Sequence, residues 1–121
     1  MKLTVLGCNG PYPAPGGACS GYLLQEGDTR VLLDCGAGVL AQLEKHMPPQ
    51  ELTAIVLSHL HYDHMSDMLP LIYRCPGLPV YLPGAPAAVR ALLENQNPTA
   101  AIYCKTGECE IRITARAQND A

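Results

Sequence analysis

The feature that most constrains this chain is a continuous apolar run that ends in a cluster of histidines. The run LTAIVL covers residues 52–57, and SHLHYDHMSDMLP follows it at residues 58–70. A short, unbroken apolar run is typical of a strand that is covered on both faces. We therefore expect a buried strand whose end carries a polar, histidine-rich loop.

The spacing within this loop brings imidazole and carboxylate groups together. Residues two apart in an extended chain point the same way, so His59 and His61 can aim two imidazoles at one point. Asp63 and His64 follow after a turn. Imidazole and carboxylate at this density predict a site for zinc or a related divalent metal. The alternative is a polar surface loop that happens to be rich in histidine, but such a loop has no reason to follow a buried strand.

The rest of the chain alternates between short strands and helices, which predicts an α/β layered domain. Strands are expected at KLTVLG (2–7), SGYLLQ (20–25), RVLLDC (30–35), LTAIVLS (52–58), PVYLPG (79–84), and in a hairpin of AAIYC (100–104) with CEIRITA (109–115). Helices are expected at GVLAQLEKHM (38–47), with Leu40, Leu43 and Met47 on one face, at SDMLPLIYR (66–74), and at APAAVRALLENQ (85–96), with Val89, Leu92 and Leu93 buried. Pro70 fits its helix only in the first turn, with Ser66 or Asp67 as the cap.

Length and charge narrow the classes of function. The 121 residues fit one domain, which we expect to span residues 1–121. A net charge of −3 gives no electrostatic support for binding nucleic acid. No stretch approaches the roughly 20 apolar residues that span a bilayer, so no membrane partner is expected. The N-terminus lacks the long apolar region of a secretory signal, so we expect a cytoplasmic protein.

The six cysteines are interpreted as reduced thiols, because a secretory signal is not recognised. Cys35 has no neighbouring His or Lys in the sequence and is expected to be buried and inert. Cys104 and Cys109 can face each other across the turn KTGE, either as a functional pair or as two buried thiols. The remaining histidine, His46, ends a predicted helix and is expected on the surface, outside the metal site.

Three segments resemble one known family. The stretch HLHYDH (59–64) has the H-x-H-x-D-H form typical of the metallo-β-lactamase-fold hydrolases, and LLDCGAG (32–38) resembles that family's first motif. The segment TVLGCNGPYPAPGGACSGYLL (4–24) resembles the opening strand and loop of the branch that includes ribonuclease Z and related phosphodiesterases. The resemblance runs from residue 1 to about residue 93.

The resemblance implies an αββα sandwich and a two-metal site. His59 and His61 would hold one Zn²⁺ and Asp63 and His64 a second, with Mn²⁺ as another candidate, and Asp63 would also serve catalysis. The metals would activate a water for attack on a phosphorus or carbonyl centre. Asp34 would not touch the metals but would order the loop that holds them. The alternative for Asp34 is a carboxylate that caps the helix after CGAG.

The chain departs from the family in having no histidine after His64. Family members carry further His and Asp ligands in a second αβ half, so we expect this chain to be the N-terminal half, a truncated domain. The expected function is a metal-dependent hydrolase, of phosphodiesterase type, that is impaired alone. The substrate would be a small molecule or a phosphodiester.

Two alternatives to a hydrolase stay open. One is a non-catalytic metal-binding or interaction module, and the other is a truncated product without a function of its own. A half-sandwich would leave apolar strand residues without a partner layer, which we expect at Val5, Leu23, Leu32 and Val56. Such residues would favour a homo-oligomer or binding of the missing C-terminal half.

Overall fold

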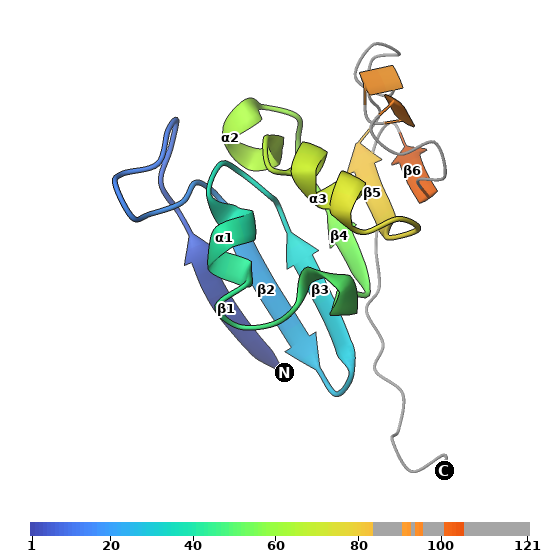
Figure 1. Ribbon diagram of the computed structural model, residues 1–121, viewed down its shortest axis with the longest axis horizontal. Helices are drawn as coiled ribbons and strands as arrows, with labels where there is room; N and C mark the ends of the chain where they lie inside the picture. Colours follow the sequence, from blue (N-terminus) through green and yellow to red (C-terminus); the bar gives the residue numbers. More distant parts are fainter. Residues whose placement is uncertain (84–90, 93, 96–100, 106–121) are drawn as a thin grey trace.

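One mixed sheet organises the chain. The computed structural model describes residues 1–83, 91–92, 94–95 and 101–105. The strands are β1 (Lys2–Gly7), β2 (Gly21–Glu26), β3 (Thr29–Leu33), β4 (Ala54–Val56), β5 (Pro79–Pro83) and β6 (Ala101–Lys105), and they lie side by side in that order (Figure 1). The first three strands are antiparallel, and β3 to β6 are parallel. The predicted α/β class is confirmed.

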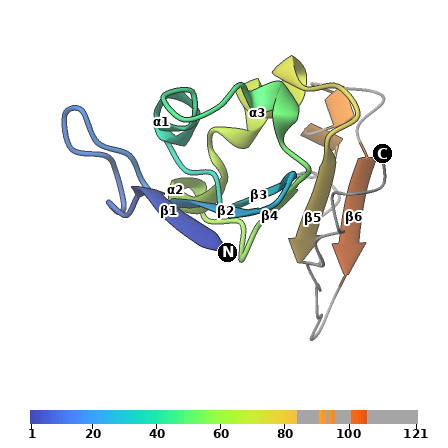
Figure 2. The same ribbon diagram turned by 90° about the horizontal axis from the view of Figure 1, so that it is seen from below.

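The helices fill the crossovers between the parallel strands. They are α1 (Val39–Leu43), the 3₁₀ turn η1 (Pro49–Glu51), α2 (Tyr62–Met65) and α3 (Met68–Arg74). Figure 2 shows α1 and α3 on the same face of the sheet. The core lies between them and the sheet, with these side chains fully buried: Leu23, Leu32, Val39, Leu43, Ile55, Met68, Leu71, Ile72 and Val80. Apolar burial of this kind is the main force that holds the layers together.

The two faces of the sheet differ because side chains alternate along each strand. Leu23 and Leu32 are register partners, and both are 0% exposed beneath the helices. The expectation that these two lack a partner layer is therefore wrong. Val5 is 57% exposed and Val56 is half-buried, and both point to the other face. The register of the strands decides which residues reach the core.

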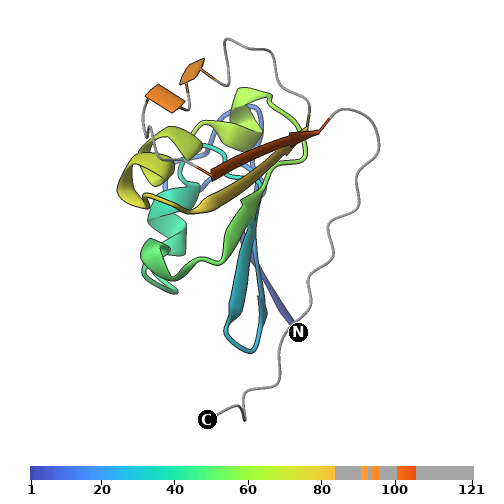
Figure 3. The same ribbon diagram turned by 90° about the vertical axis from the view of Figure 1, so that its right-hand side faces the viewer.

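A row of apolar and aromatic residues crosses the other face. It joins all six strands in register and consists of Val5, Tyr22, Leu33, Val56, Tyr81 and Tyr103, here called the open-face row. The last two rings stack, with centroids 4.9 Å apart. Figure 3 shows that the sheet twists strongly between β1 and β6, as extended L-residue strands do. Among the described residues, no helix lies on this face.

Two predicted elements are shorter than expected. The helix over 38–47 ends as α1 at Leu43, because Lys45 and His46 donate to carbonyls three residues back and tighten the chain into turns. The strand over 52–58 is reduced to β4, since only three of its residues pair with β3. Within β4 only Ile55 is fully buried, so the strand is not covered on both faces as predicted.

The C-terminal predictions are tested only in part. Residues 91, 92, 94 and 95 are helical, in agreement with the helix over 85–96. Leu92 is 45% exposed, so its place in a buried stripe is wrong, and Val89 and Leu93 lie outside the described residues. β6 confirms the strand at AAIYC. Its predicted hairpin partner and Cys109 lie outside the described residues.

The difference between the two faces predicts unequal effects of matched substitutions. Leu23→Ala removes a side chain that is 0% exposed and should lower the free energy of unfolding by about 3 kcal/mol. Leu3→Ala, on the neighbouring strand and 57% exposed, should change it by less than about 0.5 kcal/mol. Urea unfolding of the two variants measures both values. Equal losses would contradict the assignment of the faces.

Candidate functional site

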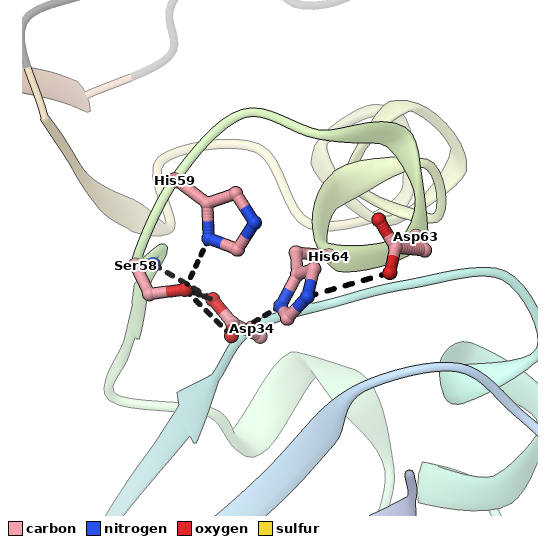
Figure 4. A network of polar contacts seen from close by, with 5 residues as sticks. All are labelled: Asp34, Ser58, His59, Asp63 and His64. Atoms are coloured by element: carbon pink, nitrogen blue, oxygen red, sulfur yellow. Dashed lines mark hydrogen bonds and ion pairs between the residues drawn. The ribbon is translucent and has the colours of Figure 1, made fainter. Parts of the chain in front are cut away.

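The histidine-rich segment lies at the carboxyl ends of two neighbouring parallel strands. β4 ends at Val56, and residues 58–61 lead into α2. β3 ends at Leu33, so Asp34 follows directly beside this loop (Figure 4). The Asp34 amide donates to the Val56 carbonyl at 2.8 Å, which holds the two strand ends together. This edge is where α/β sheets gather functional side chains.

The carboxylate of Asp34 organises the loop. It accepts hydrogen bonds from the Ser58 amide at 2.7 Å, from the Ser58 hydroxyl at 2.8 and 3.0 Å, and from His64 Nδ1 at 2.8 Å. The backbone of Asp34 is left-handed, with φ of 60°, a conformation that Asp adopts more readily than most residues. Its alternative role as the cap of α1 is wrong, because the carboxylate that bonds the first turn of α1 belongs to Asp67.

His64 stands between two carboxylates. When Nδ1 donates its proton to Asp34, the neutral ring presents the lone pair of Nε2 on its opposite side. That nitrogen lies 3.4 Å from Oδ2 of Asp63. Two acceptors that face each other can bind a cation between them. Two ligands of one tetrahedral zinc ion, each bound at about 2.0–2.1 Å, lie about 3.3 Å apart, so this pair is already spaced for one ion.

His59 and His61 complete the predicted donor set. The ring centroid of His59 lies 4.0 Å from that of His64 and 4.8 Å from that of His61. His61 is exposed and forms the N-cap of α2. In the part of the chain that the structure describes, no three donors converge on one point. The donor chemistry therefore suits a divalent metal, although the four donors are not gathered around one point.

The backbone of residues 34–36 clamps α2 against the sheet. The Cys35 amide donates to the His64 carbonyl at 2.7 Å, and the Cys35 carbonyl accepts from the Asp67 amide at 3.0 Å. The Ser20 amide donates to the Asp63 carbonyl at 3.2 Å. Gly36 allows this close approach, since a Cβ there would overlap the Asp63 carbonyl oxygen. Asp63 and His64, two of the four candidate ligands, are thus held in place through their main chain.

Two functional contacts are not predicted by the sequence patterns. Asp67 is the N-cap of α3, as predicted, but its carboxylate accepts from the Leu40 amide in α1 at 3.0 Å. It therefore ties two helices together. Ser58 bonds both Asp34 and His59, and the only sequence signal for it is a small hydroxyl residue directly before the first histidine of the motif.

The remaining histidine and the described cysteines lie outside this chemistry. His46 is exposed beyond the end of α1, as predicted. Cys35 is fully buried, and its burial, followed by the charges of Asp67 and Asp34, raises the pKa of its thiol well above the ordinary value. Burial also raises the pKa of the Cys19 thiol, with Asp63 adding to the effect. Both thiols therefore stay protonated at neutral pH and do not offer thiolate ligands.

Comparison with known proteins decides the family. Residues 29–120 match the family described as the β-lactamase superfamily domain. The chain belongs to this superfamily. Its fold matches the crystal structure of the metallo-β-lactamase fold protein YhfI from Bacillus subtilis with a TM-score of 0.76 and 33% identity, over 93% of this chain and 49% of that chain. The resemblance read from the H-x-H-x-D-H motif is thus confirmed.

The sequence matches to curated relatives cover shorter stretches, and a second solved structure shares the fold. The probable metallo-hydrolase YhfI of B. subtilis is 52% identical over 71 residues, which is 59% of this chain and 29% of the relative. A ribonuclease Z of Mycobacterium bovis is 35% identical over 69 residues, 56% of this chain and 25% of the relative. The human tRNase Z short form has a TM-score of 0.67 at 25% identity, over 86% of this chain and 44% of that chain.

This chain covers only part of the length of each relative. The chain spans about a third or less of the curated relatives it matches and about half of the two solved structures named above. One of these relatives, YhfI of B. subtilis, is named a probable metallo-hydrolase. Within the described ranges, no helix is long and apolar enough to cross a membrane.

The clamp at Gly36 gives a direct test of the site's architecture. Gly36→Ala forces α2 away from the strand ends and should lower the free energy of unfolding by about 2–3 kcal/mol. The matched control is Gly10→Ala, whose Cβ would meet only a side-chain oxygen of Asp63 at 3.2 Å and should cost less. Urea denaturation measures both. A Gly36→Ala protein as stable as the parent would show that α2 is not held this tightly.

Proposed function

We propose that this chain is the metal-binding part of a metal-dependent hydrolase that cleaves phosphodiesters. His59, His61, Asp63 and His64 would hold Zn²⁺, with Mn²⁺ as the second candidate. The observation that carries the proposal is the placement of His64, whose Nδ1 is bound to Asp34 and whose Nε2 faces Asp63 at 3.4 Å. The metal, when bound, supplies positive charge for a developing phosphate anion and acidifies a water.

The residues of this chain would bind and orient that group. Asp34 holds the ring of His64 in place, and the main chain of Asp63 is tied to Ser20, so the His64 ring and the Asp63 backbone are ordered before an ion arrives. Prior order of this kind strengthens metal binding, since less conformational freedom is lost. By the family resemblance, Asp63 is also the candidate catalytic residue.

A phosphodiester is the substrate class that the relatives favour. A ribonuclease Z and a tRNase Z, by their names, act on RNA; this chain is 35% identical to the first over 69 residues and matches the fold of the second. The net charge of −3 adds no support for a nucleic acid, so a small phosphodiester is the more economical proposal. The proposal for the class of reaction therefore rests on the site, and the choice of substrate rests on the relatives.

The open-face row supports a further part of the proposal. Val5 and Tyr103, at its two ends, are 57% and 52% exposed, which is unusual for a continuous apolar row on one sheet face. We propose that a second αβ half, as the family resemblance implies, packs on this row and carries the remaining metal ligands. A homo-oligomer through the same row is the alternative occupant.

Metal binding is the first expected outcome. The purified protein should bind zinc or manganese, and replacing His59 and His61 together by Ala should weaken binding by more than about 100-fold, because two imidazole donors are lost. Titration calorimetry with elemental analysis measures affinity and stoichiometry. His46→Ala is the matched control, since this exposed histidine lies outside the site. Equal metal binding by all three proteins would contradict the ligand assignment.

Hydrolysis of bis-p-nitrophenyl phosphate tests the reaction itself. We expect little turnover from residues 1–121 alone, and chelator-sensitive turnover when they are joined to the half of YhfI that this chain does not cover. In the joined protein Asp63→Asn should lower kcat/KM by about 100-fold or more, because a charged ligand is lost. Asp28→Asn, in the exposed turn between β2 and β3, should leave it unchanged.

Two results would contradict this account of the activity. Turnover that survives a chelator would exclude the metal-dependent reaction. Full turnover by residues 1–121 alone would show that the second half is not needed. Metal binding without turnover, both in residues 1–121 and in the joined protein, would favour the alternative of a non-catalytic metal-binding module.

A further inference from the structure

The hydroxyl of Ser58 lies between a carboxylate and a histidine. Its Oγ is 2.8 and 3.0 Å from the two carboxylate oxygens of Asp34 and 2.9 Å from Nδ1 of His59 (Figure 4). The amide of the same residue is bonded to Asp34 at 2.7 Å, so the position of Ser58 is fixed independently of its hydroxyl. The hydroxyl therefore has two polar neighbours and one proton to share between them.

Counting protons decides the direction of each bond. A carboxylate only accepts, so the single Ser58 proton must point at Asp34. The Ser58 oxygen then has only lone pairs left for His59, and Nδ1 of that ring must carry a proton to reach it. In the opposite arrangement the Ser58 hydroxyl would donate its proton to Nδ1 of His59. The Ser58 oxygen and the Asp34 carboxylate oxygen would then face each other at 2.8 Å without a proton between them. The network thus selects one tautomer of His59.

We propose that Ser58 is a positioning residue that extends the influence of Asp34 to His59 and so leaves Nε2 of that ring free to bind a divalent metal. This inference rests on the proposed function as a metal-dependent hydrolase. Asp34 fixes His64 through a direct bond and His59 through the Ser58 hydroxyl. One carboxylate therefore sets the tautomer and the ring orientation of two candidate ligands that come from opposite ends of the loop.

Crowding limits the alternatives open to His59. Its ring is half-buried, and its centroid lies 4.0 Å from that of His64. Because its neighbours already restrict this ring, holding it in one tautomer costs it little further conformational freedom. A hydroxyl is the smallest side-chain group that can contact both Asp34 and His59. Alanine at this position would keep the backbone bond to Asp34 but would leave Nδ1 of His59 without a partner inside the protein.

The test reads the tautomer directly in the metal-free protein. Long-range ¹H–¹⁵N correlation spectra of the histidine rings, recorded at a pH where imidazole is neutral, distinguish a proton on Nδ1 from one on Nε2. In the parent protein His59 should be in the Nδ1–H form, and in Ser58→Ala it should shift toward Nε2–H. His64 should keep the Nδ1–H form in both proteins, because its bond to Asp34 is direct.

Zinc affinity gives the second reading. Ser58→Ala should bind zinc about 10- to 100-fold more weakly, the range found when groups that orient metal ligands are removed. Ser58→Thr keeps the hydroxyl and should retain both the tautomer and the affinity. Ser66→Ala is the matched control, since it removes a hydroxyl from the same segment, and that oxygen is buried with no hydrogen-bond partner in the part of the chain that the structure describes. It should leave both readings unchanged.

The outcomes separate this inference from the proposed function. An Nε2–H form of His59 in the parent, or an unchanged tautomer in Ser58→Ala, would overturn the role of Ser58 even if zinc binds. A shifted tautomer with undiminished zinc affinity would overturn it as well. Failure of the parent to bind zinc would refute the proposed function, whereas the tautomers would still show whether Ser58 transmits the effect of Asp34.

Discussion

The hydrogen bonds that converge on the carboxylate of Asp34 hold the candidate site together. This carboxylate joins the end of β3 to a loop that follows β4, through Ser58 on one side and His64 on the other. A buried carboxylate without partners would cost several kcal/mol, so the arrangement is stable only when the loop supplies its donors. The order of the loop and the burial of Asp34 therefore depend on each other.

The sheet places this network at its edge and leaves one face for another layer. Helices α1 and α3 cover Leu23, Leu32 and Ile55, while the open-face row crosses the opposite side. The candidate metal ligands of this chain lie at that edge, and we propose that further ligands come from a layer that packs on the open-face row.

The sequence predicts the elements that local patterns encode. Alternation locates β1, β2 and β3, and the H-x-H-x-D-H spacing locates the candidate ligands before any fold is known. The candidate ligands lie close together on one short segment, but no three donors converge on one point among the described residues, and metal binding stays a prediction. Local patterns also place Asp67 at the start of α3, and the structure agrees.

The patterns fail where distant segments meet. The role of Asp34 depends on partners 24 and 30 residues away, and the bond from Leu40 to Asp67 spans 27 residues. No local spacing encodes such contacts. The lengths of α1 and β4 were overestimated for the same reason, because pairing with β3 and turns after Leu43 end these elements. The register that buries Leu23 and exposes Val5 is likewise a property of the whole sheet.

The central claim is that Asp34 orders metal ligands without binding the metal. Anomalous diffraction at the zinc edge, from crystals grown with zinc, tests it most directly. The account predicts a peak at about 2.0–2.1 Å from both Nε2 of His64 and Oδ2 of Asp63, with Asp34 still bonded to Nδ1 of His64 and to Ser58. A zinc ion bound by Asp34 itself, or one found while His64 has turned away from Asp63, would contradict it.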